Sequence, residues 1–295
     1  MISAVIPVKL RHCEKKEGIK QCELLFRSLS KFCQEGTFKK IFVICPSIDL
    51  LELNVLSERW PELSIEVVDE NVLIGHLRMK GFVDGWVLQQ IIKLKAHELV
   101  ETDFYLTFDG DCLCIRNMGY EDLVNDNKAL IQLEDKKIHS QWWKGAAEVL
   151  DYPLDFNKIG MSVTPAILSR DVVKGLINEL SLKYASWESK LLSYCIKFVN
   201  GQPRGWLPHQ IWSEYTLYFL YLEKHGLLWD YHFTFGGEYW EETLISKKCC
   251  WVIDEYDQLE PEILFNGEGR GFFSVIQSNM NVPVAEIEAL LSPYI

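Results

Sequence analysis

Short runs of apolar residues alternate with amphipathic stretches along the first third of the chain. Consecutive apolar residues bounded by Pro or polar turn residues are typical of buried strands, whereas apolar residues spaced by three and four are typical of helices. The pattern predicts six elements in the order strand, helix, strand, strand, helix, strand. The strands are expected at residues 3–8, 40–45, 64–68 and 104–108, and the helices at residues 19–32 and 85–101.

This alternation predicts an α/β fold with a Rossmann-type, mostly parallel central sheet flanked by helices. Ligands on such sheets bind at the carboxyl ends of the strands. Three of the expected strands are followed by candidate ligand-binding segments, at residues 7–9, 69–70 and 109–111. We therefore expect these three segments to lie at one edge of the sheet.

The second half of the chain has a more mixed pattern. It predicts a strand at residues 159–164, helices at about 165–180, 187–198 and 207–225, a late strand at 271–277 and a closing helix at 284–291. Pro208 suits the first turn of the helix at 207–225. No repeat, linker or low-complexity segment marks a boundary, so residues 1–295 are expected to form a single domain.

Composition narrows the class of protein. Hydrophobic residues make up 48% and charged residues 24% of the 295 residues, which suits a large buried core. The formal net charge of −12 disfavours a nucleic-acid binder, which needs excess Lys and Arg to displace counterions. The nine cysteines are odd in number and form no CxxC pair, so free thiols in a reducing compartment are expected. No apolar run of membrane-spanning length occurs, so a cytoplasmic protein is expected, with attachment to a membrane surface left open.

The segment with the strongest chemical signal follows the fourth expected strand. There, Asp109 and Asp111 lie two residues apart with Gly110 between them. Two carboxylates at a strand end can both reach Mg²⁺ or Mn²⁺ and leave coordination positions free for phosphate oxygens. The glycine lets the backbone turn and a donor ligand approach. The alternative is an acidic turn whose carboxylates are solvated or cap the next segment.

The sequence Phe-Asp-Gly-Asp after a strand resembles the DxD motif of GT-A glycosyltransferases. Residues 85–117 look like part of a little-characterised bacterial group of putative GT-A transferases, and residues 206–218, WLPHQIWSEYTLY, are similar to a second block of that group. The resemblance implies a GT-A-like fold, with a nucleotide-binding half at 1–117 and an acceptor-binding half at 118–295. It also implies that Asp109 and Asp111 hold Mn²⁺ or Mg²⁺ against the diphosphate of a nucleotide sugar, with a UDP-sugar as the expected donor. The implied acceptor is a saccharide or glycolipid in bacterial surface polysaccharide synthesis, beside the inner membrane.

Further donor contacts are expected from three places. On the helix at 85–101, Gln89 and Lys93 lie on a polar face, and the Lys93 ammonium could offset the charge of a departing diphosphate. A solvated face is the alternative interpretation. Pro7 and Lys9 follow the first strand, where the resemblance implies a nucleotide contact, and Asp69 could bind the base or ribose.

Catalytic and acceptor contacts are expected from the second half. Glu214 lies in an apolar helix, where a buried carboxylate is costly unless it is paired or functional. It is therefore the first candidate for the base that accepts the acceptor's hydroxyl proton, with an ion pair to Lys or Arg as the structural alternative. His209 is the second candidate base. Trp142, Trp143 and Trp212 are candidates for stacking on an acceptor sugar, with packing in the core as the alternative for the tandem tryptophans.

Some features of the reaction stay undetermined by the sequence. Many GT-A enzymes supply a further metal or phosphate contact at the end of the late strand, but Gln277, Ser278 and Asn279 include no His. The third metal ligand is therefore open, as is the choice between inversion and retention at the sugar.

Two other functions compete with glycosyl transfer. A phosphohydrolase of the haloacid-dehalogenase type also has DxD after an apolar strand, but near its N-terminus and with a second acidic pair later. Here three expected strands precede the strand that leads into the motif, and no GDxxxD segment follows. A catalytically dead nucleotide- or sugar-binding module would keep the fold without the chemistry.

Overall fold

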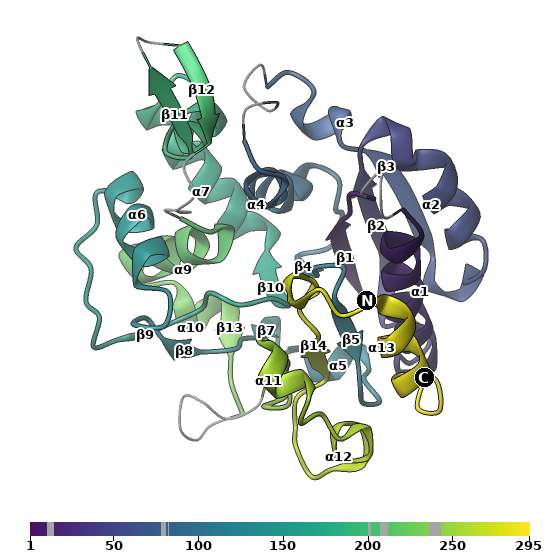
Figure 1. The fold of residues 1–295 in the computed structure, drawn as a ribbon. Coiled ribbons are helices and arrows are strands. Elements are labelled where there is room, and N and C mark those ends of the chain that lie inside the picture. Colours follow the sequence, from purple (N-terminus) through teal and green to yellow (C-terminus); the bar gives the residue numbers. More distant parts are fainter. Residues whose placement is uncertain (11–14, 78–80, 82, 200–201, 207–211, 236–242) are drawn as a thin grey trace.

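A five-stranded sheet with the strand order β10-β4-β1-β2-β3 lies at the centre of the molecule (Figure 1). The computed structural model describes residues 1–10, 15–77, 81, 83–199, 202–206, 212–235 and 243–295. Strands β1 to β4 run parallel, and β10 is antiparallel to β4. The parallel arrangement of the first four strands confirms the expected sheet. These strands are β1 (Ile2–Pro7), β2 (Phe38–Cys45), β3 (Ile65–Asp69), β4 (Phe104–Thr107) and β10 (Ala166–Ser169).

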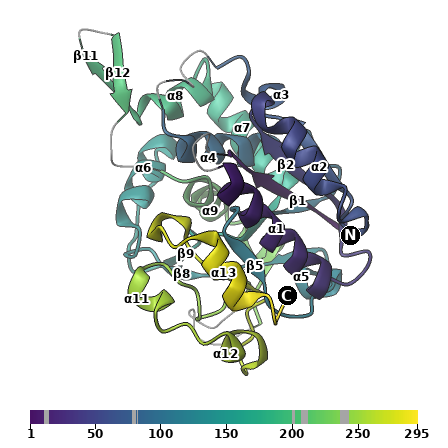
Figure 2. The same cartoon turned by 45° about the vertical axis from the view of Figure 1, so that its right-hand side comes forward.

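Helices bury both faces of this sheet (Figures 1 and 2). Alternate residues of a strand point to opposite faces, so Ala4 and Ile6 belong to a hydrophobic cluster with residues of α1 and α2, while Val5 belongs to one with residues of α4, α7 and α9. Burial on both sides explains why the strands are apolar runs without polar alternation. The helices are α1 (Lys15–Phe32), α2 (Leu50–Ser57), α4 (Gly85–Lys95), α7 (Arg170–Lys183) and α9 (Glu214–His225).

Shorter elements surround the central sheet. Strand β14 pairs antiparallel with β5, which directly follows the acidic motif, and the closing helix α13 packs against α1. The remaining helices are α3 (Asn71–Ile74), α5 (Tyr120–Leu123), α6 (Ser140–Leu150), α8 (Trp187–Ser193), α10 (Leu228–Tyr231), α11 (Ile253–Tyr256), α12 (Pro261–Asn266) and α13 (Val284–Leu291). The remaining strands are β5 (Cys112–Cys114), β6 (Val124–Asn125), β7 (Lys128–Leu130), β8 (Glu134–Asp135), β9 (Ile159–Gly160), β11 (Ile196–Val199), β12 (Gln202–Trp206), β13 (His232–Phe233) and β14 (Phe273–Val275). Within the described ranges, no helix combines the length and apolar character that crossing a bilayer requires.

The predicted helix at 165–180 is wrong in its first turn. Residues 166–169 form β10, which extends the central sheet beside β4, and α7 begins at Arg170. The side chain of Ser169 caps α7 by accepting a hydrogen bond from the Val172 amide at 3.4 Å. Only three apolar residues precede the cap. A run of that length is too short to distinguish the periodicity of a strand from that of a helix.

Other predicted boundaries also shift. The helix expected at 187–198 ends at Ser193 and gives way to β11, and the strand expected at 159–164 is only the two-residue β9. The helix expected at 85–101 is α-helical to Lys95 and continues as a short 3₁₀ turn. The helix expected at 207–225 begins at Glu214; residues 207–211, with Pro208, lie outside the described residues.

Candidate active site

The acidic motif lies at the carboxyl edge of the central sheet. The Phe108 amide donates to the Val5 carbonyl at 3.0 Å, so the pairing of β4 with β1 continues to the residue before Asp109. The Asp109 carbonyl then accepts from the Cys112 amide at 3.2 Å, which turns the chain into β5. Gly110 does not need a left-handed backbone for this turn. A Cβ atom at Gly110 would meet no atom within 4 Å, so the space beside the two carboxylates is open to a ligand.

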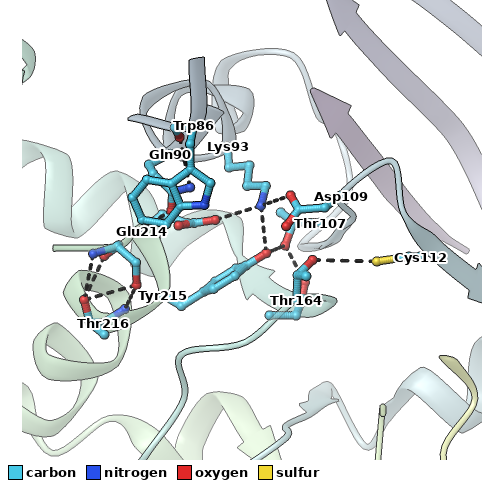
Figure 3. A network of polar contacts seen from close by, with 12 residues as sticks. Trp86, Gln90, Lys93, Thr107, Asp109, Cys112, Thr164, Glu214, Tyr215 and Thr216 are labelled. Atoms are coloured by element: carbon cyan, nitrogen blue, oxygen red, sulfur yellow. Dashed lines mark hydrogen bonds and ion pairs between the residues drawn. The ribbon is translucent and has the colours of Figure 1, made fainter. Parts of the chain in front are cut away.

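Lys93 lies at the centre of a buried polar network beside this motif (Figure 3). Its ammonium contacts Asp109 Oδ1 at 2.6 Å and Glu214 Oε1 at 2.9 Å, and it donates to the Tyr215 hydroxyl at 3.2 Å. The Lys93 side chain is 1% exposed and that of Glu214 is 0% exposed, whereas that of Asp109 is 26% exposed. The network therefore runs from the interior to the accessible carboxylate of the motif.

A chain of hydroxyl groups fixes the far side of Lys93. The Thr107 hydroxyl donates to the Ala166 carbonyl at 2.9 Å, so the Tyr215 hydroxyl, 2.9 Å from it, is the donor to Thr107. That leaves the Tyr215 oxygen free to accept from Lys93. Strand β4, strand β10 and helix α9 thus jointly hold the ammonium in place.

The charges of this network are strongly coupled. Burial disfavours the charged ammonium, but the carboxylates of Asp109 and Glu214 outweigh it and raise the pKa of Lys93 well above its ordinary value. Burial also raises the pKa of the Glu214 carboxyl, and Lys93 opposes that shift only in part. Apart from the ion pair with Lys93, neither Glu214 oxygen receives a hydrogen bond from the described residues.

Asp111 is held by the segment that follows β14. Its Oδ2 accepts a hydrogen bond from the Ser278 amide at 3.0 Å. Burial and the neighbouring negative charge of Asp109 raise the pKa of Asp111 to about 6. A cation between the two carboxylates would relieve that repulsion, and carboxylate oxygens are the ligands that Mg²⁺ and Mn²⁺ prefer. The donor set of the motif therefore fits a divalent metal ion.

A third protein ligand does not emerge from the described residues. No group of three His, Cys, Asp or Glu side chains among them could hold a metal ion. At the end of the late strand, Ser278 contributes its backbone amide to Asp111. Two carboxylates would leave most coordination positions to water or phosphate oxygens, which is common for Mg²⁺.

The expected donor contacts lie at different depths around the same edge. Pro7 ends β1 and is buried, whereas Lys9 is exposed just beyond it. Gln89 is partly exposed on α4. Lys93 is not on a solvated polar face, because α9 and β4 pack over it. Asp69 ends β3, where it accepts hydrogen bonds from the Ser47 hydroxyl at 2.6 Å and the Asn71 amide at 2.8 Å.

The three tryptophans expected at the acceptor have different environments. Trp143 is 0% exposed and packs edge-on against Phe219, and Trp212 is 1% exposed and donates to the Leu191 carbonyl at 3.1 Å. Stacking of these two rings on an acceptor sugar is therefore wrong for this conformation, since the core covers both. Trp142 is partly exposed and is stacked on His139, with ring centroids 4.1 Å apart.

The two candidate bases have different outcomes. Glu214 is the first residue of α9 and forms the ion pair that was its structural alternative. Its carboxylate is fully buried, so in this conformation it is not exposed as a direct base would have to be. His209 lies outside the described residues.

Three network residues were missed by the sequence interpretation. Tyr215 is adjacent to Glu214, and Thr107 is a polar residue inside an apolar strand, a signal that could have singled it out. Gln90 accepts a hydrogen bond from the Glu214 amide at 3.3 Å and donates to the Trp86 carbonyl at 3.1 Å. Its burial on α4 could not be inferred from helical spacing.

Comparisons with known proteins identify the fold. A family model described as "Family of unknown function (DUF6492)" matches residues 1–295, and no characterised protein matches the sequence. Mouse xyloside xylosyltransferase 1 in its apo form is similar in structure, with a TM-score of 0.50 and 11% identity over 96% of this chain and 99% of that chain. The galactosyltransferase LgtC, in complex with donor and acceptor sugar analogues, has a TM-score of 0.51 and 11% identity, covering 99% of this chain and 96% of that chain. The mixed α/β architecture is thus that of the GT-A glycosyltransferases, as expected.

Proposed function

The chain belongs to the DUF6492 family, whose function is unknown, and we propose that it is a metal-dependent glycosyltransferase that moves a sugar from a nucleotide-sugar donor to a hydroxyl acceptor. The observation that carries this proposal is the placement of Asp109 and Asp111. They lie close together and partly exposed at the carboxyl edge of a parallel sheet with the GT-A fold. That edge is where ligands of such sheets bind.

The length of the sheet edge supports a nucleotide-sized donor. Asp69 at the end of β3 lies three strands away from Asp109 at the end of β4, which corresponds to roughly 14 Å at the usual strand spacing. A nucleotide sugar laid along this edge would place its base near Asp69, its ribose near Pro7 and Lys9, and its diphosphate near Gly110. We propose a UDP-sugar as the donor.

Asp109 and Asp111 would hold Mn²⁺ or Mg²⁺. When bound, the cation supplies positive charge that stabilises a departing diphosphate. The protein's own part is to keep both carboxylates oriented through Lys93 and the Ser278 amide, and to leave open space over Gly110.

The proposed acceptor-binding site is supported by fewer residues. Trp142 on α6 forms a row of rings with His139 and Trp86, whose centroid is 5.5 Å from that of Trp142. Amphipathic aromatic rings suit the apolar faces of sugars, so this row is proposed to contact a saccharide or glycolipid acceptor. Bacterial surface polysaccharide synthesis at the cytoplasmic face of the inner membrane is the process we propose, with His209 as a remaining candidate for the base.

Titration of the protein with UDP, GDP and CMP, each with and without Mn²⁺, tests the proposal by calorimetry. We expect one nucleotide to bind, and only when the metal is present. Asp111→Ala should abolish that binding and the Mn²⁺-dependent hydrolysis of the matching nucleotide sugar, because one of two metal ligands is lost. Full metal-dependent hydrolysis in Asp111→Ala would refute the site.

The same experiment separates the competing functions. A phosphohydrolase would cleave a generic aryl phosphate, but its second acidic pair does not occur with the motif among the described residues. A dead module would bind a nucleotide without hydrolysing or transferring its sugar. Binding of no nucleotide at all would refute the donor site.

A further inference from the structure

Glu214 is a fully buried carboxylate at the start of α9. Its side chain is 0% exposed, and Lys93 is the only described side chain in polar contact with its oxygens. Burying an ion pair costs more in lost hydration than the attraction usually returns, so such pairs are weak sources of stability. The pair therefore calls for an explanation other than folding.

The position of the Lys93–Glu214 pair beside the acidic motif supplies such an explanation. Asp109 and Glu214 are no more than 5.5 Å apart at their nearest oxygens, because both contact one nitrogen atom at 2.6 and 2.9 Å. Lys93 takes one oxygen of Asp109 and fixes its rotamer, which orients the motif. If Lys93 had no second carboxylate beside it, its ammonium would also offset the negative charge of Asp109 that attracts a cation.

Glu214 restores that charge. Lys93, Asp109, Asp111 and Glu214 together carry one positive and three negative formal charges, a net charge of two negative units. That balance matches a divalent cation. Without Glu214 the same site would be only singly negative, although Asp109 would still be held by Lys93.

We propose that Glu214 is a positioning residue that acts through Lys93: it is the internal counter-charge that lets Lys93 orient Asp109 without weakening the cation site. The proposal rests on the proposed metal-dependent function and adds an assigned role for the buried pair. Among the described residues the Glu214 carboxylate is in polar contact with Lys93, so its proposed effect on Asp109 is electrostatic and runs through the Lys93 ammonium.

Metal affinity measured on charge-changing variants tests this role. Calorimetry with Mn²⁺ alone, at a temperature where each variant is folded by circular dichroism, gives Kd without relying on activity. Glu214→Gln should raise the Kd for Mn²⁺ by about tenfold or more, since a full charge is lost near a partly buried site. The double variant Lys93→Gln/Glu214→Gln should bind within about threefold of the unaltered protein, because the net charge returns to two negative units.

A matched control comes from a second buried lysine, whose carboxylate partner lies near the other end of α9 and also contacts Lys158 at 3.2 Å. Lys136, 0% exposed, contacts Glu223 at 2.6 Å, and Glu223 is 15% exposed. Glu223→Gln removes the carboxylate that faces the buried Lys136 and should destabilise the fold without changing the Kd for Mn²⁺. A purely structural role of Glu214 would make the two single variants behave alike.

The outcomes are distinguishable. If the unaltered protein binds Mn²⁺ and Glu214→Gln binds it equally well, the counter-charge role is wrong while the metal site stands. If Glu214→Gln does not fold, the double variant becomes the test of the counter-charge role. An affinity of the double variant for Mn²⁺ at least about tenfold below that of the unaltered protein overturns the role. If the unaltered protein binds no Mn²⁺ with or without UDP, both proposals are wrong.

Discussion

At the residue scale, the ammonium of Lys93 determines how the acidic motif is presented. It contacts three oxygens, one from Asp109 after β4 and two from the adjacent residues Glu214 and Tyr215 at the start of α9. Lys supplies three donors and no acceptor, so it is held by hydrogen-bond acceptors placed around it. Of the three, Asp109 alone reaches the surface, and Lys93 therefore connects the core to the motif.

Gly110 allows a sharp prediction at this scale. Its backbone is not left-handed and a side chain would meet no protein atom near the Cβ position. Gly110→Leu should therefore leave the thermal unfolding midpoint nearly unchanged but fill the open space, so that UDP with Mn²⁺ binds at least about tenfold more weakly, equivalent to 1.4 kcal/mol. Calorimetry and a melting curve on the same preparation measure both. Gly110→Ala should give a smaller loss, and unchanged nucleotide binding in Gly110→Leu would contradict the donor contact.

At the element scale, the N-terminus of α9 decides where Glu214 and Tyr215 point. Ser213 caps the helix: its hydroxyl accepts from the Thr216 amide at 3.2 Å, and the Thr216 hydroxyl accepts from the Ser213 amide at 3.0 Å. This reciprocal pair fixes the first turn. The two network residues are the first two residues of that turn, so their placement depends on the cap.

Ser213→Ala should lower the free energy of unfolding by about 1 kcal/mol, the usual cost of a lost cap. Because the first turn would fray, the affinity for Mn²⁺ should also fall. Chemical denaturation and calorimetry measure the two effects. Ser169→Ala, which removes the cap of α7, should cost similar stability and leave the metal affinity unchanged. Equal metal affinities in both variants would show that the cap of α9 has no role in the site.

At the scale of the whole molecule, a buried histidine joins distant parts of the chain. His232, 1% exposed, donates through Nδ1 to the Ala129 carbonyl at 3.2 Å and accepts through Nε2 from the Tyr218 hydroxyl at 2.7 Å. The Tyr218 oxygen in turn accepts from the Ser169 amide of β10 at 2.9 Å. Both contacts are those of a neutral imidazole, so protonation would disturb β13, α9 and the edge of the sheet together.

Burial lowers the pKa of His232 from 6.5 to about 4. The unfolded chain therefore binds a proton on His232 more readily than the folded protein does. The stability contributed by neutral His232 is fully present above pH 6.5 and is lost as the pH falls through about 4. At about pH 4 the free energy of unfolding is lower by about 3 kcal/mol on this account. Urea denaturation at several pH values should show it, and His232→Gln should be less stable at pH 7 with a flatter dependence below pH 6.5. An unchanged slope in that variant would contradict the assignment.

The local pattern of the sequence determined the framework of this protein. Strands β1 to β4, their parallel order and the acidic motif at a strand end all follow from short-range signals, because apolar runs and turn residues act within a few positions. These features fix which edge of the sheet carries the acidic motif. Strand β10 was missed because its apolar run is too short to show a period.

Only the tertiary structure decided which side chains are buried and which of them meet. Lys93 and Glu214 are far apart in sequence, and helical spacing placed Lys93 on a polar face, yet α9 packs over it and buries both. The same packing removes Trp143 and Trp212 from the surface while leaving Trp142 partly exposed. Periodicity reports the faces of one element, whereas burial and charge pairing depend on the neighbouring elements that cover those faces.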